Sequence, residues 1–166
     1  MTVTSPKGPV SAVIARLPQQ LVGSTTFLLK RLGYAAKERA MSAYEQLGLH
    51  PYHHAILIAL GESSHETQGS IADALGYDRG QLVGLLDELE KRGLVERRRD
   101  PQDRRRHLVS LTADGKRMLA GLNTVARENE AAFLDPLTDA ERETLHTLLL
   151  KLAERYEPGC APLPRT

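Results

Sequence analysis

The stretch from Asp78 to Thr112, DRGQLVGLLDELEKRGLVERRRDPQDRRRHLVSLT, combines one helical pattern with two short strand patterns. Its first part places leucines at helical spacing and ends at Gly93, a residue suited to a helix C-terminus. The period then changes: residues 94–99 and 106–111 are short apolar segments, and residues 100–103 between them have strong turn chemistry. The sequence therefore predicts a helix followed by a two-stranded hairpin with a charged tip.

A second, shorter helix is predicted just before this stretch. Thr67 is a suitable N-cap for it and Gly76 a suitable end. Asp78, followed three positions later by Gln81, resembles the capping box that begins the next helix. Two short helices joined by a tight glycine turn form a helix-turn-helix unit. With the hairpin behind it, the unit predicts a winged helix-turn-helix.

Helical patterns also flank this unit on both sides. The further predicted elements are a long helix at 17–47, a helix at 51–61, a polar loop at 62–66, a helix from Thr112 to about Leu134 and, after Pro136, a helix that begins with a capping box of Thr138 and Glu141. The outer helices present more leucine and alanine than a small lobe can bury. A second copy of the chain is the expected cover.

The hairpin concentrates positive charge that the whole chain lacks. The 166 residues carry a net charge of only +1, so nucleic acid can be held only by a local basic patch. Six arginines crowd the arms and tip of the hairpin: Arg97, Arg98, Arg99, Arg104, Arg105 and Arg106. Such crowding costs energy unless a polyanion neutralises it, and an arginine at the tip suits a narrow minor groove. Asp100 and Asp103 are expected to stiffen the loop by pairing with neighbouring arginines.

The helix after Asp78 carries a face suited to the major groove of double-stranded DNA. A helix that enters this groove needs small, polar or cationic residues near its N-terminus. The candidates are Arg79, Gly80, Gln81 and Gly84. Gln81 can contact an adenine or a phosphate, and Arg79 a phosphate or a guanine; the sequence leaves both alternatives open.

Several of these segments resemble the MarR family of bacterial transcriptional regulators. The resemblance is carried by residues 67–72, by DRGQLVGLLDELEKRG from Asp78, by Leu94-Val95 and, most specifically, by DPQDRRRHLVSLT from Asp100, and it extends from about Leu17 to Tyr156. Two positions depart from the family pattern: His50 stands where a threonine cap is common, and Gly84 where several members have arginine.

The resemblance implies a homodimer whose first and last helices interlock, with recognition helices in successive major grooves and wings in the flanking minor grooves. It implies that Arg105 is the wing arginine and Asp103 its positioning carboxylate, and it adds Gln68 to the DNA-contacting candidates. It also implies regulation by a small phenolic or other weak organic acid. Such an effector is expected between the dimer helices and the DNA-binding lobes, where Arg31, Tyr34, His53 and His54 are the candidate pocket residues.

We therefore predict a mainly α fold with a small two-stranded β-wing and a helical dimerisation region. The predicted organisation is one domain at 17–157, with a DNA-binding lobe at about 51–111, dimerisation helices at about 17–47 and 113–157, and flexible tails at 1–16 and 158–166. The predicted function is that of a ligand-responsive repressor that binds a palindromic operator as a homodimer. The alternatives are a DNA-packing protein that does not select a sequence, and a protein-interaction module that has abandoned DNA.

Other kinds of chemistry find less support in the sequence. His50, His53 and His54 have poor spacing for a metal, and no cysteine accompanies them, so we predict no metal and no cofactor. Cys160, the single cysteine, is interpreted as a passive thiol rather than an oxidation sensor. No phosphate loop, nucleophile elbow, HExxH motif or membrane-length apolar run is present, so we expect a cytoplasmic protein that is not an enzyme.

Overall fold

The computed structural model describes residues 16–63, 66–157 and 159. The predicted tails, apart from Arg16 and Gly159, lie outside these residues, as does Cys160. In the described part of the chain the elements are, in order, α1 (Gln19–Val22), α2 (Thr25–Glu45), α3 (Pro51–Glu62), β1 (Glu66–Thr67), α4 (Gln68–Leu75), α5 (Arg79–Lys91), β2 (Val95–Arg99), β3 (His107–Leu111), α6 (Ala113–Phe133) and α7 (Asp139–Tyr156).

The chain forms two compact units, one ending at Ala36 and one running from Lys37. The first unit holds α1 and the beginning of α2. The sequence predicted one continuous helix here, and the structure corrects this by separating α1 from α2 at Gly23 and Ser24. The Oγ of Ser24 accepts a hydrogen bond from the N–H of Phe27 at 3.3 Å. Because glycine is a weak helix former and serine satisfies a free N–H, this pair ends one helix and begins the next.

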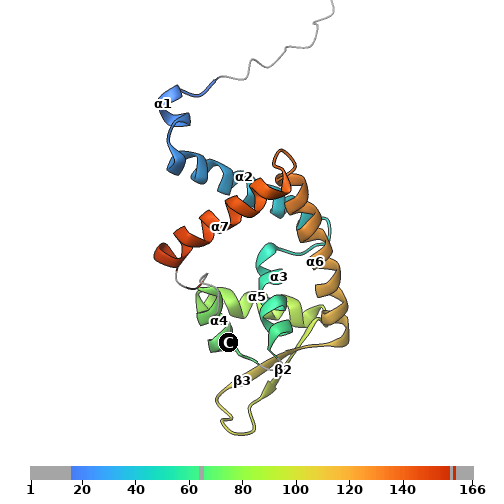
Figure 1. Ribbon diagram of the computed structural model, residues 1–166. Helices are drawn as coiled ribbons and strands as arrows, with labels where there is room; N and C mark the ends of the chain where they lie inside the picture. The colour runs from blue at the N-terminus through green and yellow to red at the C-terminus, as the bar shows by residue number, and fades with distance from the viewer. Residues whose placement is uncertain (1–15, 64–65, 158, 160–166) are drawn as a thin grey trace, which may run out of the picture. The chain divides into compact units, whose positions relative to one another are not determined.

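The second unit contains the helix-turn-helix, formed by α4 and α5 and packed against α3, and the hairpin that follows it (Figure 1). Thr67 caps α4 by accepting a hydrogen bond from the N–H of Ser70 at 3.0 Å. Gly76 ends α4 with a φ of +65°, a left-handed conformation that favours glycine. Asp78 then caps α5 by accepting two N–H bonds from its first turn. The predicted winged helix-turn-helix is confirmed.

The hairpin belongs to a three-stranded antiparallel sheet in the order β1-β3-β2. The sequence predicted two strands and a polar loop at 62–66, and the structure corrects this, because the end of that loop forms β1. β1 pairs with Leu108 and Val109 in the middle of β3. A strand of two residues is too short to produce an alternating apolar pattern, so periodicity could not reveal it.

One apolar core connects the helix-turn-helix, the sheet and α6. Its most deeply buried side chains are Ile56, Leu57, Ile71, Leu82, Leu86, Leu89, Val95, Val109 and Leu122. Gly115 allows α6 to approach the sheet closely, because a Cβ at this position would overlap the carbonyl oxygen of Leu94. The Thr112 hydroxyl accepts from the N–H of Gly115 at 3.0 Å and donates to the carbonyl of Gly93 at 2.6 Å. These contacts fix the start of α6 against the segment that leads into β2.

α7 presents an uncovered apolar face. It begins at the predicted capping box, in which the N–H of Thr138 donates to the Glu141 carboxylate at 2.8 Å. None of its side chains is buried, and four of its larger apolar ones are 39–71% exposed: Leu148, Leu149, Leu152 and Tyr156. Of the helices in the described ranges, none has the length and apolar character needed to cross a membrane.

Candidate nucleic-acid interface

α5 has an exposed polar side and a buried apolar side, as the sequence predicted. The exposed residues are Arg79, Gly80, Gln81 and Gly84. On the other side Leu82, Leu86 and Leu89 are at most 1% exposed. A Cβ at Gly84 would meet no atom within 4 Å among the described residues. Gly80 and Gly84 therefore leave a strip of α5 without side chains, the glycine strip, along which the helix can approach another surface closely.

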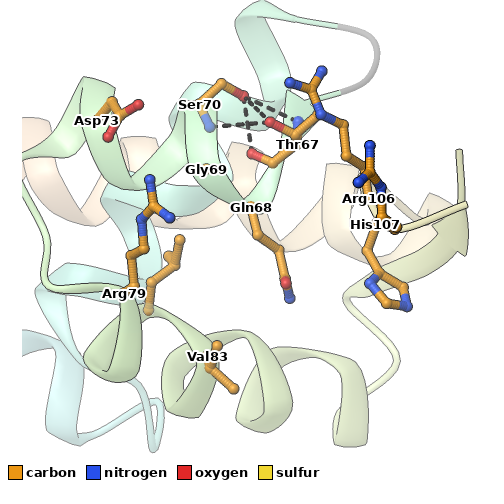
Figure 2. Close-up of a pocket in the computed structure, with 11 residues that line it drawn as sticks. Thr67, Gln68, Gly69, Ser70, Asp73, Arg79, Val83, Arg106 and His107 are labelled. Atoms are coloured by element: carbon orange, nitrogen blue, oxygen red, sulfur yellow. Dashed lines mark hydrogen bonds between the residues drawn. The ribbon is translucent and has the colours of Figure 1, made fainter. Parts of the chain in front are cut away.

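A hollow of about 650 Å³ is lined by residues of α4, α5 and the wing, which we define as residues 95–111 (Figure 2). The residues that line this α4–α5–wing hollow are Thr67, Gln68, Gly69, Ser70, Asp73, Arg79, Leu82, Val83, Arg105, Arg106 and His107. It brings together four predicted DNA-contacting residues from three parts of the chain: Gln68, Arg79, Arg105 and Arg106. The remaining predicted residues lie outside its lining.

At the wing tip one carboxylate orients two arginines. The Oδ1 of Asp103 accepts a hydrogen bond from the backbone N–H of Arg105 at 3.1 Å and another from its Nε at 3.2 Å, and the Oδ2 lies 3.8 Å from the Nε of Arg106. The Arg105 side chain is nevertheless 92% exposed. Asp100 was expected to stiffen the loop by pairing with an arginine. In the described part of the chain it forms no ion pair, and it stabilises the turn instead by accepting from the backbone N–H of Gln102 at 2.8 Å.

Arg97 differs from the other wing arginines in its surroundings. Its side chain is only 21% exposed, and its guanidinium contacts Asp87 at 2.6 Å and Glu90, both on α5. The hydrogen bond from Arg97 lowers the pKa of Glu90, and the same bond raises the pKa of Arg97. Arg97 therefore connects β2 to α5, and any direct part in DNA contact stays a prediction.

The side chains of three other wing arginines, Arg98, Arg99 and Arg104, are exposed to solvent. Arg98 lies 3.0 Å from Glu96, but its side chain is 76% exposed. Arg99 and Arg104 are exposed as well. Guanidinium groups in this setting are available to neutralise phosphates.

The neighbouring histidines form the N-terminal cap of α3. The Nδ1 of His50 accepts from the N–H of Tyr52 at 3.1 Å, and the Nδ1 of His53 accepts from the N–H of His50 at 3.1 Å. Imidazole nitrogens thus do the work that hydroxyl or carboxylate oxygens do in most caps. Within residues 16–63 and 66–157, no three His, Cys, Asp or Glu side chains are grouped to hold a metal ion.

His53 also faces α5. Its side chain is buried, and its Nε2 lies 3.1 Å from the Oε2 of Glu88, within ion-pair distance but without the alignment of a hydrogen bond. Because Nδ1 is an acceptor in the cap, the proton of the neutral ring is on Nε2. Burial lowers the pKa of His53, Glu88 opposes this shift, and His50 and Arg92 add to it. His53 is therefore neutral at pH 7.

His54 joins α2, α3 and α6. Its Nδ1 lies 2.6 Å from the hydroxyl of Tyr44, and its Nε2 lies 2.8 Å from the Oδ1 of Asn123. Both ring nitrogens are thus occupied by protein partners. Arg31 and Tyr34 belong to the first unit. The predicted effector pocket of Arg31, Tyr34, His53 and His54 stays a prediction.

Seven of the eleven lining residues were not among the predicted DNA contacts, and two of them, Val83 and His107, lie close along the chain to predicted arginines. Val83 lies on α5 one turn after Arg79 and is 42% exposed. Counting four residues from Arg79 along a helix would have identified it, since residues at this spacing share a face. His107 is exposed and directly follows Arg106 at the start of β3. Its position directly after three arginines could have identified it as a residue of this surface.

The chain and its fold are similar to known regulators. Residues 47–106 match the model of the MarR family. The chain is 30% identical to the putative transcriptional regulatory protein for the hcr operon of Thauera aromatica, over 87% of this chain and 88% of that protein. The structure resembles the transcriptional repressor CouR bound to a 23-mer DNA duplex, with 30% identity, a TM-score of 0.76, and coverage of 84% of this chain and 99% of that chain. It also resembles the PcaV transcriptional regulator of Streptomyces coelicolor in complex with its natural ligand, with 26% identity, a TM-score of 0.68, and coverage of 87% and 100%.

Proposed function

The chain belongs to the MarR family of transcriptional regulators, and from this premise we propose that it is a ligand-responsive repressor that binds a palindromic operator as a homodimer in the cytoplasm. The observation that carries the proposal is the convergence of Arg79, Arg105 and Arg106 on one hollow with Gln68. Three cations and an amide, from α4, α5 and the wing, line the same space there. A polyanion with regularly spaced acceptors matches that arrangement.

The proposal assigns different parts of the duplex to the helix and the wing. The exposed side of α5 with the glycine strip enters the major groove, where Arg79 and Gln81 reach base edges or phosphates. Arg105, held by Asp103, enters the adjacent minor groove. Arg98, Arg99 and Arg104 neutralise phosphates, and Arg97 acts by holding β2 against α5.

A second copy of the chain is the proposed cover for the exposed apolar helices. α7 has no buried side chain, and its leucines stay in contact with solvent. In the first unit Leu21, Leu28, Leu29 and Leu32 are exposed too. Burial of these faces stabilises a dimer by roughly 25 cal/mol per Å² of apolar surface. Twofold symmetry then places two recognition helices roughly 34 Å apart, one turn of DNA.

The proposed effector is a small organic acid or a phenol. The Arg31 cation suits a carboxylate or phenolate, and the Tyr34 side chain, 61% exposed, can donate a hydrogen bond. His53 and His54 are buried and bonded, so they can serve an effector only when their present partners are released. An effector relieves repression if it favours a dimer whose recognition helices no longer match adjacent grooves.

A competition experiment tests the proposal. A duplex is selected with the purified protein from a library of random sequences, and its binding is titrated against random DNA over a range of salt concentrations. A repressor keeps a large preference for the selected duplex, whereas a DNA-packing protein keeps almost none. Absence of any duplex binding at low salt would favour the protein-interaction module. Sedimentation of the free protein tests the homodimer separately.

A further inference from the structure

One apolar side chain of the α4–α5–wing hollow is exposed. Of the two branched apolar residues in the lining, Leu82 is 1% exposed and belongs to the core, whereas Val83 is 42% exposed. Figure 2 shows Gln68 extending from α4 toward α5, where Arg79 and Val83 lie. A single exposed valine on a protein surface needs no explanation. This one stands among the cations and polar groups that are proposed to face DNA.

The space around Val83 allows a close approach to a groove. Gly80 and Gly84 form the glycine strip beside Val83, and the space outside Gly84 is open. Val83 therefore projects further from α5 than the two glycines beside it. Because valine is β-branched, its rotamer is largely fixed in a helix. Its two methyl groups can make a contact with little loss of side-chain entropy.

The major groove offers one apolar group to such a side chain. Base edges there present hydrogen-bond donors and acceptors, and thymine adds its C5-methyl group. A valine placed against a polar edge would remove water from donors and acceptors without replacing their hydrogen bonds. We propose that Val83 reads the C5-methyl group of a thymine in each operator half-site. This inference rests on the proposed function and names a specificity-determining residue for it.

The experiment removes the methyl group from the DNA and the side chain from the protein in turn. The probe is the duplex selected with the wild-type protein, with deoxyuridine in place of one symmetric pair of thymines at a time. The dissociation constant of each duplex is measured for the wild type and for Val83→Ala. At one thymine per half-site, deoxyuridine should weaken wild-type binding about fourfold per half-site, the effect of burying one methyl group. The same substitution should leave Val83→Ala binding unchanged.

A matched control separates this contact from general effects. Ile58→Ala removes an apolar side chain of similar exposure, 38%, on α3 and outside the hollow. It should show the wild-type sensitivity to deoxyuridine. Thermal unfolding checks that Val83→Ala folds; Val83→Ser, which also lacks both γ-methyl groups, replaces it in the measurement if it does not.

The outcomes distinguish the inference from the proposed function. If the wild type selects a duplex but no thymine is coupled to Val83, the inference is overturned and the repressor proposal stands. If Val83→Ala stays as sensitive to deoxyuridine as the wild type at every thymine, the inference is overturned as well. If the wild type selects no duplex at all, both are overturned.

Discussion

The Oδ1 of Asp103 accepts hydrogen bonds from both the backbone N–H and the Nε of Arg105, at 3.1 and 3.2 Å. This carboxylate holds a nearly fully exposed guanidinium in one direction at the wing tip. Arg105→Ala should therefore lose about 1–3 kcal/mol of operator affinity per wing, since a preorganised groove contact disappears. A gel-shift titration measures the loss. Arg117→Ala removes an exposed arginine of α6 outside the hollow and should bind as the wild type does.

Removal of Asp103 should change specificity more than affinity. Asp103→Ala takes away a negative charge close to the proposed DNA surface, which strengthens binding to any duplex. It also frees Arg105 and Arg106 from their common partner, which weakens the oriented contact. The ratio of random-DNA to operator dissociation constants should therefore fall. Asp114→Ala, which removes an exposed carboxylate on α6, should leave this ratio unchanged. An unchanged ratio for Asp103→Ala would remove its positioning role.

The sequence predicted those parts of the molecule whose structure follows from local chemistry. Thr67, Asp78 and Thr138 cap helices where the sequence placed them, because a capping side chain bonds to N–H groups two or three residues away. β1 was missed because its pairing with β3 joins residues about 40 positions apart and leaves no local pattern. The break at Gly23 and Ser24 was underestimated, since the apolar pattern continues through it.

Tertiary contacts, and not the local sequence, determine how the wing arginines differ from one another. Composition alone does not distinguish the six arginines of the wing from one another. Arg97 differs because it forms ion pairs with Asp87 and Glu90 of α5, the helix that precedes β2. The cap of α3 is a second such case, because it takes its two acceptors from the imidazole rings of His50 and His53. These roles depend on side-chain contacts that no local sequence pattern records.

Arg97 should contribute to stability more than to binding. Arg97→Gln removes its ion pairs with Asp87 and Glu90, and because the carboxylates are partly exposed the free energy of unfolding should fall by only about 1 kcal/mol. Urea denaturation measures this value. Arg98→Gln, on the same strand but with a side chain 76% exposed, should change it very little. Equal losses in the two variants would contradict the structural role of Arg97.

Gly115 should tolerate no side chain. A methyl group at this position overlaps the Leu94 carbonyl oxygen, so α6 must move away from the sheet in Gly115→Ala. The expected loss in unfolding free energy is about 1–3 kcal/mol, the usual effect of overpacking. Gly121→Ala lies on the same helix, where a Cβ meets no described atom within 4 Å, and should raise stability by up to about 1 kcal/mol through helix propensity. Thermal or urea unfolding compares the two, and similar values would refute the close approach.

The His53 ring predicts a particular pH dependence of folding. Burial lowers its pKa below the ordinary value of 6.5, so between the two pKa values the unfolded chain binds more protons than the folded one. Stability therefore rises with pH over this range and is lost as the pH falls below about 6.5. Above pH 6.5 this residue should contribute no slope, because the ring is neutral in both states.

The variant His53→Asn isolates this contribution. An asparagine Oδ1 can accept the N–H of His50 as the imidazole Nδ1 does, so the α3 cap is retained while the titrating group is removed. The free energy of unfolding, measured by urea denaturation from pH 5 to pH 8, should then fall less steeply below about pH 6.5 than in the wild type. His146→Asn, at an exposed position of α7, should keep the wild-type slope. Parallel profiles for the wild type and His53→Asn would show that His53 is not the group whose protonation destabilises the fold.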